Sequence, residues 1–436
     1  MKKGTRTLLL LLGDILALFG AFWAMLYISY GKNLSAYVID MHSLPFLFIG
    51  ALWLVIFFIF DLYSTQSTRP TIPQLRNIFI AFIIASAVAV IFFYVIPFFG
   101  IAPKTNLFIF AGMALILFIL WRRLFYSVFS SYFRKNVAFL VSRQGTGLHI
   151  EDFSNYFANS PQSGFISMGA YPSLEDFSRK YAGKFPDVFI VSKDVWRTPE
   201  TFKKLYATES EIMDLAYAYE YILGRIPVEA IDEDWFIHNL PSSRRKTYDI
   251  EKRVSSIIFS ALVMIATSPF LLLVALCIKI HDGGPVLYSQ ERVGRGGRNF
   301  KLYKFRSMVV DAEKNGPEWS SKSDARITPV GRIIRKLHID EVPQMINVIK
   351  GDIALVGPRP ERPSFVAALE NEIPFYHLRH IISPGFTGWA QIKFRYAGTV
   401  MESKEKFEYD LYYLKNRNIF IDLGIVLRTV QIIFTH

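Results

Sequence analysis

The first 125 residues alternate between long apolar runs and short polar connections. Four runs approach the roughly 20 residues that span the hydrocarbon core of a bilayer. They are Leu8–Tyr30, Leu44–Tyr63, Asn77–Phe98 and Leu107–Trp121. No small-residue cleavage site follows the first run, so we interpret it as a retained helix rather than a signal peptide. The pattern therefore predicts a domain of four transmembrane helices over residues 1–125.

Lysine and arginine gather on one side of these predicted helices. Three basic residues precede the first run, two arginines separate the second from the third, and Arg122, Arg123 and Arg134 follow the fourth. The other two connections hold only Lys32 and Lys104. Because cytoplasmic loops carry the excess of positive charge, both ends of the four-helix segment are predicted to be cytoplasmic.

Asp14 lies inside the first apolar run. A carboxylate in this position is costly and often functional. The alternative is a structural carboxylate that faces neighbouring helices or lies near the membrane interface, and we favour this second interpretation.

From residue 136 to residue 220 short β-rich runs alternate with helical ones. Strands are expected at Val137–Val141, Phe165–Met168 and Val188–Val191, and helices at Ile150–Ala158, Ser173–Tyr181 and Pro199–Glu209. Such alternation predicts a small parallel, Rossmann-like α/β domain. The loop after the first strand reads SRQGTG and lacks the glycine spacing of a dinucleotide fingerprint. We therefore expect a degenerate domain with a structural or regulatory role, followed by a linker at residues 221–248.

A fifth apolar run, Val254–Ile280, is also long enough to span a bilayer. A crossing here would place the rest of the chain outside the cell, but basic residues flank the run on both sides and favour no orientation. Ser268 and Pro269 fall near its centre, where a proline removes a backbone donor and bends a helix. We therefore predict a re-entrant helix over 254–280, broken at Ser268-Pro269, with both ends cytoplasmic.

Composition agrees with this mixed organisation. The 436-residue chain is 52% hydrophobic, which is too apolar for an ordinary soluble protein and too polar for one that lies wholly in the membrane. Its single cysteine, Cys277, excludes an intrachain disulfide framework. The net charge of +12 suits an anionic bilayer, a nucleic acid or phosphorylated substrates.

Residues 285–362 hold fifteen Lys and Arg against nine Asp and Glu. Glycines lie between the basic residues in Tyr288–Met308, and glycine lets backbone N–H groups approach an anion closely. Arginine forks match phosphate oxygens in a bidentate way. A phosphate site and a basic surface facing anionic lipid are both open. A nucleic-acid site is disfavoured, because no recognisable nucleic-acid motif accompanies the charge.

Asp340 and Glu341 form an adjacent acidic pair in this basic region. Pro343 is tolerated only in the first turn of a helix, so we expect a helix that starts at an Asp340 N-cap and runs to Lys350. Both carboxylates would then lie at the positive end of the helix dipole, where they stay ionised.

Two interpretations of this pair are open. Either Asp340 only caps the helix and Glu341 only complements the helix dipole, or the pair belongs to a site for Mg²⁺ and phosphoryl chemistry. The neighbouring cations Arg335, Lys336 and Arg359 favour the second. The two carboxyls of a glycosidase lie ~5–9 Å apart across a sugar, usually on separate elements, so adjacent residues argue against that class.

Four stretches resemble the bacterial polyprenyl-phosphate glycosyl-1-phosphate transferases, in the large form that initiates exopolysaccharide, capsule or O-antigen synthesis. They are GGPVLYSQERVGRGGRNFKLYKFRSM, TPVGRIIRKLHIDEVPQMINVIKGDIALVGPRPERP, SPGFTGWAQI and YDLYYLKNRNIFIDLGIVLRTV, and they cover nearly all of residues 250–436 in order. The four N-terminal spans and the middle domain match more loosely. The resemblance implies a mostly helical catalytic domain at 249–436 that contains the re-entrant helix.

The resemblance implies a hexose-1-phosphate transferase at the cytoplasmic face of the bacterial inner membrane. The donor would be a UDP-sugar, with glucose or galactose expected, and the acceptor would be undecaprenyl phosphate. Asp340 would attack the sugar-linked phosphorus, release UMP and form a covalent aspartyl-phosphosugar intermediate. Asp340 and Glu341 would hold Mg²⁺. Four basic residues would neutralise phosphate charge: Lys304, Arg306, Arg335 and Arg359.

Several points stay open. Lys393–Thr399 reads KFRYAGT where many members carry an Asn-Gly-Arg-Asn-like run, so the donor sugar is uncertain. Ile419–Phe434 is either an interfacial helix or an ordinary core helix. A non-catalytic membrane scaffold for polysaccharide assembly is the alternative function, which the intact acidic and basic motifs disfavour. A homodimer is compatible with the sequence, and the pathway served is not specified by it.

Overall fold

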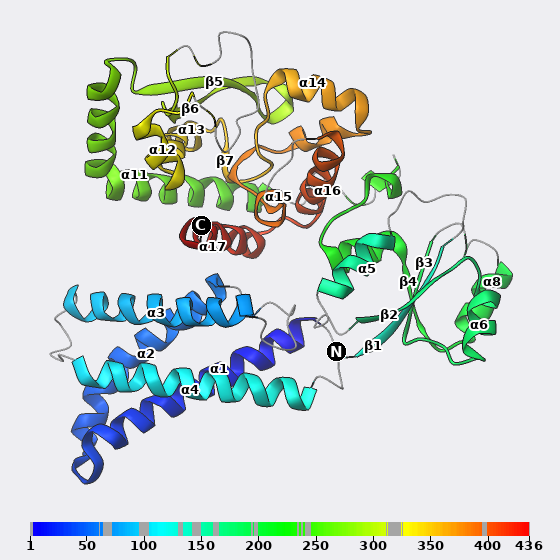
Figure 1. Cartoon of the computed structure of the whole chain (residues 1–436), viewed down its shortest axis with the longest axis horizontal. Helices are drawn as coiled ribbons and strands as arrows, with labels where there is room; N and C mark the ends of the chain where they lie inside the picture. Colours follow the sequence, from blue (N-terminus) through cyan, green and yellow to red (C-terminus); the bar gives the residue numbers. More distant parts are fainter. Residues whose placement is uncertain are drawn as a thin grey trace. The chain divides into compact units, whose positions relative to one another are not determined.

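The computed structural model describes most of the chain, and the described residues are 3–60, 62–63, 72–95, 104–129, 134–141, 150–159, 165–192, 195, 199–232, 235–236, 239, 246–310, 312, 324, 326–394 and 399–435. The chain divides into two compact units, Met1–Ala218 and Tyr219–His436 (Figure 1). The first unit holds two separate hydrophobic clusters, one within residues 10–125 and one within residues 138–205, and the second unit has its own.

The N-terminal unit begins with four long helices, and each of them overlaps one predicted apolar run. They are α1 (Lys3–Tyr30), α2 (Ala36–Ile59), α3 (Ile72–Val95) and α4 (Lys104–Phe129), with the short turn η1 (Gly31–Asn33) between the first two. Trp53 is fully buried among the rings of Phe57, Phe82 and Phe110. Large apolar side chains also cover the outside of the helices, a pattern typical of helices that contact lipid.

Four helices in the described part of the chain are long and apolar enough to cross a membrane. They are Thr7–Asn33, Ala36–Ile59, Thr105–Phe125 and Thr247–Asp282. The corresponding apolar part of α3, Asn77–Phe93, is shorter. The chain therefore has the apolar helices of a membrane protein in both units.

Asp14 is fully buried inside the helix bundle and pairs with Arg122 of α4. Nη2 of Arg122 donates to Oδ2 of Asp14 at 2.6 Å, and Nη1 donates to the carbonyl oxygen of Leu62 at 2.8 Å. Gly13 lets α1 approach α4, because a Cβ there would overlap the indole of Trp121. The geometry agrees with the structural interpretation, in which the carboxylate faces a neighbouring helix.

The second part of the N-terminal unit is a four-stranded parallel sheet with the strand order β2-β1-β3-β4. Its strands are β1 (Lys135–Leu140), β2 (Phe165–Tyr171), β3 (Val188–Val191) and β4 (Glu211–Asp214), and its helices are α5 (Ile150–Asn159), α6 (Leu174–Tyr181), α8 (Pro199–Tyr206) and α9 (Leu215–Ala218). The three predicted strands are present, and β4 extends the sheet. The central strands β1 and β3 are the most buried, as expected in a parallel sheet. The SRQGTG loop lies outside the described residues.

The C-terminal unit is mostly helical, with two short sheets. Its elements are η4 (Tyr219–Leu223), η5 (Val228–Ala230), α11 (Lys246–Asp282), β5 (Leu287–Val293), η7 (Arg295–Gly297), β6 (Asn299–Phe305), α12 (Pro329–Lys336), η8 (Ile339–Glu341), α13 (Gln344–Lys350), β7 (Ala354–Val356), α14 (Pro363–Glu372), η9 (Tyr376–Ile381), β8 (Gly385–Thr387), α15 (Trp389–Lys393), α16 (Val400–Asn416) and α17 (Ile419–Thr435). β5 and β6 form an antiparallel hairpin, and β7 and β8 form a parallel pair.

Part of the predicted linker packs into the core of this unit. Ile226, Val228 and Ile231 are buried in the same cluster as residues of α14 and α16. Arg225 forms ion pairs with Glu405 and Glu408 of α16. This stretch of the predicted linker is therefore a structural element of the C-terminal unit.

α11 is one uninterrupted helix of 37 residues, which corrects the predicted break at Ser268-Pro269. Figure 1 shows the helix bent into two arms. Pro269 cannot donate to the carbonyl of Ile265, and the hydroxyl of Ser268 donates to that carbonyl instead at 2.8 Å. The hydroxyl of Thr267 donates to the carbonyl of Val263 in a similar way. The carbonyl of Ile265, which receives no backbone donor from Pro269, thus accepts from Ser268 within a helix that continues past the proline.

Both ends of α11 are attached to the core of the C-terminal unit. Near its start, Arg253 donates to the carbonyls of Val348 and Ile349 at the end of α13. At its end, Asp282 pairs with Arg306, which follows β6. Between these ends the helix exposes large apolar side chains, among them Leu262, Ile265, Leu272, Leu273 and Leu276. A helix in contact with water rarely exposes so much apolar surface, so this face fits a lipid environment.

α17 has two different faces, and neither predicted alternative describes it alone. Ile425 is fully buried, and Asp422 accepts hydrogen bonds from the hydroxyls of Tyr413 at 2.6 Å and Tyr248 at 2.8 Å. Phe420, by contrast, is 81% exposed on the other face. The helix packs into the core and also presents apolar side chains outward.

Candidate active site

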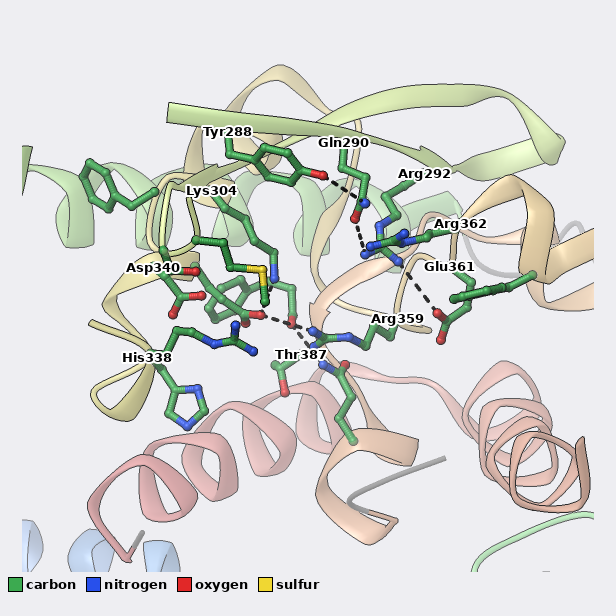
Figure 2. A pocket seen from close by; sticks show the side chains of 18 of the residues that line it. Tyr288, Gln290, Arg292, Lys304, His338, Asp340, Arg359, Glu361, Arg362 and Thr387 are labelled. Carbon is green, nitrogen blue, oxygen red and sulfur yellow. Dashed lines mark hydrogen bonds and ion pairs between the residues drawn. The ribbon is translucent and has the colours of Figure 1, made fainter. Parts of the chain in front are cut away.

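One cavity of about 780 Å³ in the C-terminal unit brings the predicted site residues together. Its wall includes Lys304, Arg306, Arg335, Asp340, Glu341 and Arg359. They come from β6 and the residue after it, α12, η8 and the turn after β7. Figure 2 shows Asp340 and His338 at one side of the cavity and Arg292, Arg362 and Glu361 at the other. The volume suits a drug-sized or nucleotide-sized ligand.

The acidic pair lies in the short turn η8, between α12 and α13. The predicted Asp340-capped helix is wrong, because α13 begins at Gln344 and no side chain caps it. The N–H of Val342 instead donates to the carbonyl of Ile339, which closes a 3₁₀ turn before Pro343. α13 has only seven residues and begins after the pair, so burial and nearby side-chain charges set the electrostatics of the two carboxyls.

His338 turns the chain from α12 into η8. Its φ of 55° lies in the left-handed region, which is uncommon for a residue other than glycine. Such conformations persist only where the surrounding structure maintains them. The turn brings His338 and Asp340 to the same side of the cavity (Figure 2).

Glu341 is bound by two cations. Nζ of Lys304 donates to its Oε1 at 2.7 Å, and Nη2 of Arg359 donates to the same oxygen at 3.1 Å. Burial opposes ionisation of this carboxyl, but the two cations hold the pKa of Glu341 well below its usual range. Two of the four predicted phosphate ligands therefore meet at one ionised carboxylate.

Asp340 has a different environment from its neighbour. It is buried at the cavity wall, 9% exposed. Burial, and next the negative charge of Glu341, raise the pKa of Asp340 above its ordinary value, although Lys304 and Arg335 attract its ionised form. Both carboxylates were expected to stay ionised. The surroundings favour the charge of Glu341, whereas burial and the charge of Glu341 disfavour that of Asp340.

Arg306 reaches the cavity through a close packing contact. Its side chain is 7% exposed and pairs with Asp282 at the end of α11. A Cβ on Gly284 would lie 1.8 Å from Nη1 of Arg306, so this position of the guanidinium requires glycine at 284. Arg335 lines the same cavity from α12.

Glycines of the GPRP and SPGFTG motifs allow β7 and β8 to approach closely. A Cβ on Gly385 would lie 2.0 Å from the backbone nitrogen of Gly357, and a Cβ on Gly388 would lie 2.1 Å from its carbonyl oxygen. The N–H of Gly357 donates to the carbonyl of Thr387 at 2.8 Å. This contact positions the turn that carries Arg359 into the cavity wall.

The cavity wall also contains hydrogen-bonded polar side chains that were not identified from the sequence. Nε2 of Gln290 donates to the hydroxyl of Tyr288 at 3.2 Å, and Nη2 of Arg292 donates to Oε1 of Gln290 at 2.7 Å. Nζ of Lys406 donates to Oε1 of Glu361 at 2.6 Å. Tyr288, Gln290 and Arg292 alternate along β5 and so lie on one face of the strand. That period of two was the available signal in the sequence.

Asp340 and Glu341 are suitable ligands for a metal ion that is also bound by the phosphates of a substrate. In the described part of the chain, no group of three or more His, Cys, Asp or Glu side chains could hold a metal. Mg²⁺, however, is usually bound by one or two carboxylates together with waters and substrate phosphates. Asp340 and Glu341 supply such a pair, so the predicted metal ligands are chemically suitable.

Two family models match the chain. A model of the bacterial sugar transferases matches residues 247–436, which include α11 and the cavity. A model described as a CoA-binding domain matches residues 58–186. The second match covers α3, α4 and the first strands of the parallel sheet.

Curated relatives resemble the chain over part of its length. The UDP-N-acetylgalactosamine-undecaprenyl-phosphate N-acetylgalactosaminephosphotransferase of Aeromonas hydrophila is 42% identical over 216 residues, 50% of each chain. The UDP-glucose:undecaprenyl-phosphate glucose-1-phosphate transferase of Escherichia coli K12 is 38% identical over 292 residues, 63% of each chain. The match thus spans about half to two thirds of these two enzymes.

A shorter relative is covered almost completely. The exopolysaccharide production protein PSS of Rhizobium leguminosarum bv. phaseoli is 40% identical over 185 residues, which are 41% of this chain and 92% of that protein. Together with the C-terminal family match, this similarity confirms the family predicted from the sequence motifs. The chain therefore belongs to the bacterial sugar transferases that act as polyprenyl-phosphate glycosyl-1-phosphate transferases.

Proposed function

We propose that this protein transfers a sugar 1-phosphate from a UDP-sugar to undecaprenyl phosphate and releases UMP. The observation that carries the proposal is the acidic pair in a cavity wall rich in cations. A sugar nucleotide brings a diphosphate, whose negative charge the surrounding lysine and arginines offset. The names of the Aeromonas and Escherichia relatives support undecaprenyl phosphate as the acceptor and a UDP-sugar as the donor.

Asp340 is the nucleophile in this proposal. Its carboxylate oxygen bonds to the phosphorus that bears the sugar, while the bond from that phosphorus to the bridging oxygen breaks and UMP leaves with the electron pair. The sugar phosphate remains on the aspartate as an acyl phosphate. An oxygen of undecaprenyl phosphate then attacks the same phosphorus, and Asp340 leaves as a carboxylate. The raised pKa makes Asp340 a more basic nucleophile than an ordinary aspartate.

Glu341 positions Lys304 and Arg359 for binding of the UDP-sugar. It holds Lys304 and Arg359 at the cavity wall, from which their remaining donors would bind a diphosphate in the cavity. Glu341 and Asp340 would also hold Mg²⁺ together with the diphosphate. A bound Mg²⁺ supplies charge neutralisation for the phosphate oxygens.

A UMP-release screen tests the proposal. The full-length protein in membranes is given undecaprenyl phosphate, Mg²⁺ and one of UDP-glucose, UDP-galactose or UDP-N-acetylgalactosamine. We expect UDP-glucose or UDP-galactose to be the best donor, and continuous UMP release to require the lipid phosphate. Absence of UMP release with every UDP-sugar would contradict the proposed function.

Transfer is expected to fall at low pH as Asp340 becomes protonated. Because burial and Glu341 raise its pKa, activity falls at higher pH than an ordinary aspartate with a pKa of about 3.9 would allow. Glu341→Gln removes the negative charge beside Asp340 and so lowers the pKa of Asp340. The fall in activity of the Glu341→Gln variant at acid pH should therefore occur at lower pH than in the wild type. Profiles of kcat/KM for UMP release against pH check this, and an acid limb that moves to higher pH would refute it.

We also propose that α11 is re-entrant and that the cavity faces the cytoplasm of a bacterial inner membrane. Arg253 near the start of α11 and Asp282 at its end both bind the core of the same unit. A straight crossing would place these ends on opposite sides of the bilayer. Figure 1 shows α11 bent into two arms, and Pro269 inside the helix is a residue type that bends helices; such a bend would allow the helix to enter one leaflet and return.

Cysteine labelling tests this topology. In a Cys277→Ser background, Lys301→Cys should be labelled only from the cytoplasmic side, because Lys301 is exposed on β6 of the C-terminal unit. The matched control, Lys32→Cys, lies in the exposed turn between α1 and α2 and should be labelled only from outside. Labelling of Lys301→Cys from outside would show that α11 crosses the membrane.

A further inference from the structure

A buried ion pair lies behind the part of the cavity wall that carries Arg359. Arg379 of η9 and Asp410 of α16 have side chains that are 2% and 3% exposed, and Nη2 of Arg379 lies 2.9 Å from Oδ2 of Asp410. Neither of these two residues lines the cavity. Buried charges are costly unless they are paired and hydrogen-bonded, so their contacts indicate their role.

Arg379 connects this ion pair to the backbone of the cavity wall. The same Nη2 that meets Asp410 donates to the carbonyl oxygen of Arg359 at 3.0 Å. Nη1 donates to the hydroxyl of Tyr376, a residue of the cavity wall. Nη2 of Arg379 is therefore shared between the Asp410 carboxylate and the Arg359 backbone carbonyl.

The carbonyls that follow Arg359 are held from β5. Nη1 of Arg292 donates to the carbonyl of Pro360 at 3.2 Å, and the N–H of Val293 donates to the carbonyl of Glu361 at 3.0 Å. Three consecutive carbonyls thus have three separate donors. Prolines at 358 and 360 also have fixed φ angles, so little backbone freedom remains around Arg359.

We propose that Arg379, held by Asp410, is a positioning residue for sugar-phosphate transfer. It fixes the backbone of Arg359 so that the Arg359 guanidinium meets Glu341, at 3.1 Å from Oε1, and the diphosphate of the donor. The part played by the diphosphate rests on the proposed function. Displacement of a catalytic group by about 1 Å can lower a rate by as much as about a hundredfold, so a residue outside the cavity can have a large effect.

A purely structural ion pair would have a different consequence. It would hold η9 against α16 and affect stability, and its loss would lower activity independently of the Arg359 side chain. A positioning residue acts through Arg359, so its effect should disappear when the Arg359 guanidinium is absent. The combination of the two substitutions therefore distinguishes the two roles.

A double-mutant cycle on kcat/KM for UMP release tests the proposal, with Arg379→Lys, Arg359→Ala and the two combined. Lysine keeps the charge at position 379 but lacks the planar fork that reaches several acceptors together. We expect losses of about tenfold for Arg379→Lys and about a hundredfold for Arg359→Ala. The combined variant should match Arg359→Ala within about threefold.

Two results would overturn the positioning role. One is a combined loss of about a thousandfold, the product expected for independent effects. The other is an Arg379→Lys variant with wild-type kcat/KM. A wild-type protein that releases no UMP from any UDP-sugar would instead contradict the proposed function, so the two failures are distinguishable.

Arg225→Lys is the matched control. Arg225 is another buried arginine, 7% exposed, that pairs with carboxylates of α16, and it does not line the cavity. We expect Arg225→Lys to leave kcat/KM unchanged, alone or with Arg359→Ala. If Arg379→Lys does not fold, Asp410→Asn replaces it in the cycle, because it removes the anchor of Arg379 at nearly constant shape. Melting temperatures of all variants separate loss of fold from loss of activity.

Discussion

Asp340→Asn should lower UMP release by about a thousandfold or more, the scale of loss seen when a covalent nucleophile is removed. Asparagine has nearly the same shape but no anionic oxygen to attack phosphorus. In the absence of undecaprenyl phosphate, the wild-type protein should release a burst of about one UMP per molecule, because the first half-reaction needs only the donor. Asp340→Asn should show no burst. A mass increase of one sugar phosphate on the wild-type peptide that contains Asp340 would identify the intermediate.

Asp352→Asn controls for loss of a nearby carboxylate. Asp352 follows α13, accepts a hydrogen bond from Asn347 at 2.9 Å and does not line the cavity. Its variant should keep the UMP burst. If Asp340→Asn turned over at the wild-type rate, Asp340 would not be the nucleophile. Glu341→Gln should retain a slower burst, because Glu341 organises the cations without forming the covalent bond.

Arg122→Ala is expected to destabilise the helix bundle by about 3–5 kcal/mol, because it leaves the buried Asp14 carboxylate without its counter-charge. The same substitution removes the donor to the carbonyl of Leu62. Thermal unfolding of the full-length protein in detergent measures the effect. The double variant Asp14→Leu, Arg122→Met should be much closer to the wild type, because it removes both charges together and fills the space with apolar atoms.

Arg123→Ala is the control for this prediction, since Arg123 is exposed on the same helix. Its effect should stay within about 0.5 kcal/mol, as for most surface substitutions. A similarly small effect of Arg122→Ala would mean that the ion pair does not stabilise the bundle.

Local patterns in the sequence were sufficient for the positions of most helices and strands. Apolar runs marked α1 to α4, because a helix in lipid must be apolar nearly all round its surface. The buried strands β1 and β3 followed from short apolar runs between turn signals. The family motifs also pointed directly to the acidic pair and its cations.

The predicted ends of helices and of the linker were less accurate, because contacts with neighbouring groups determine where these elements begin and end. Pro269 suggested a broken helix, but the hydroxyl of Ser268 supplies a donor to the carbonyl that the proline leaves free. Asp340 suggested an N-cap, but the chain closes a 3₁₀ turn before α13 begins at Gln344. Ile226 lay in a predicted linker, although contacts with α16 bury it. In each case a local preference competes with an interaction that the pattern does not contain.

The sequence by itself determined the family, the apolar helices and the residues with suitable chemistry for phosphoryl transfer. Only the tertiary structure decided which of these residues meet. Lys304 and Arg359 lie 37 and 18 residues from Glu341 along the chain, yet both bind the same oxygen. Charge–charge energies depend on distance and burial in three dimensions, so adjacent carboxylates with the same local sequence acquire opposite pKa shifts. The contact from Arg379 to the Arg359 backbone has no signature in the sequence, because it depends on how η9, α16 and the turn after β7 pack together.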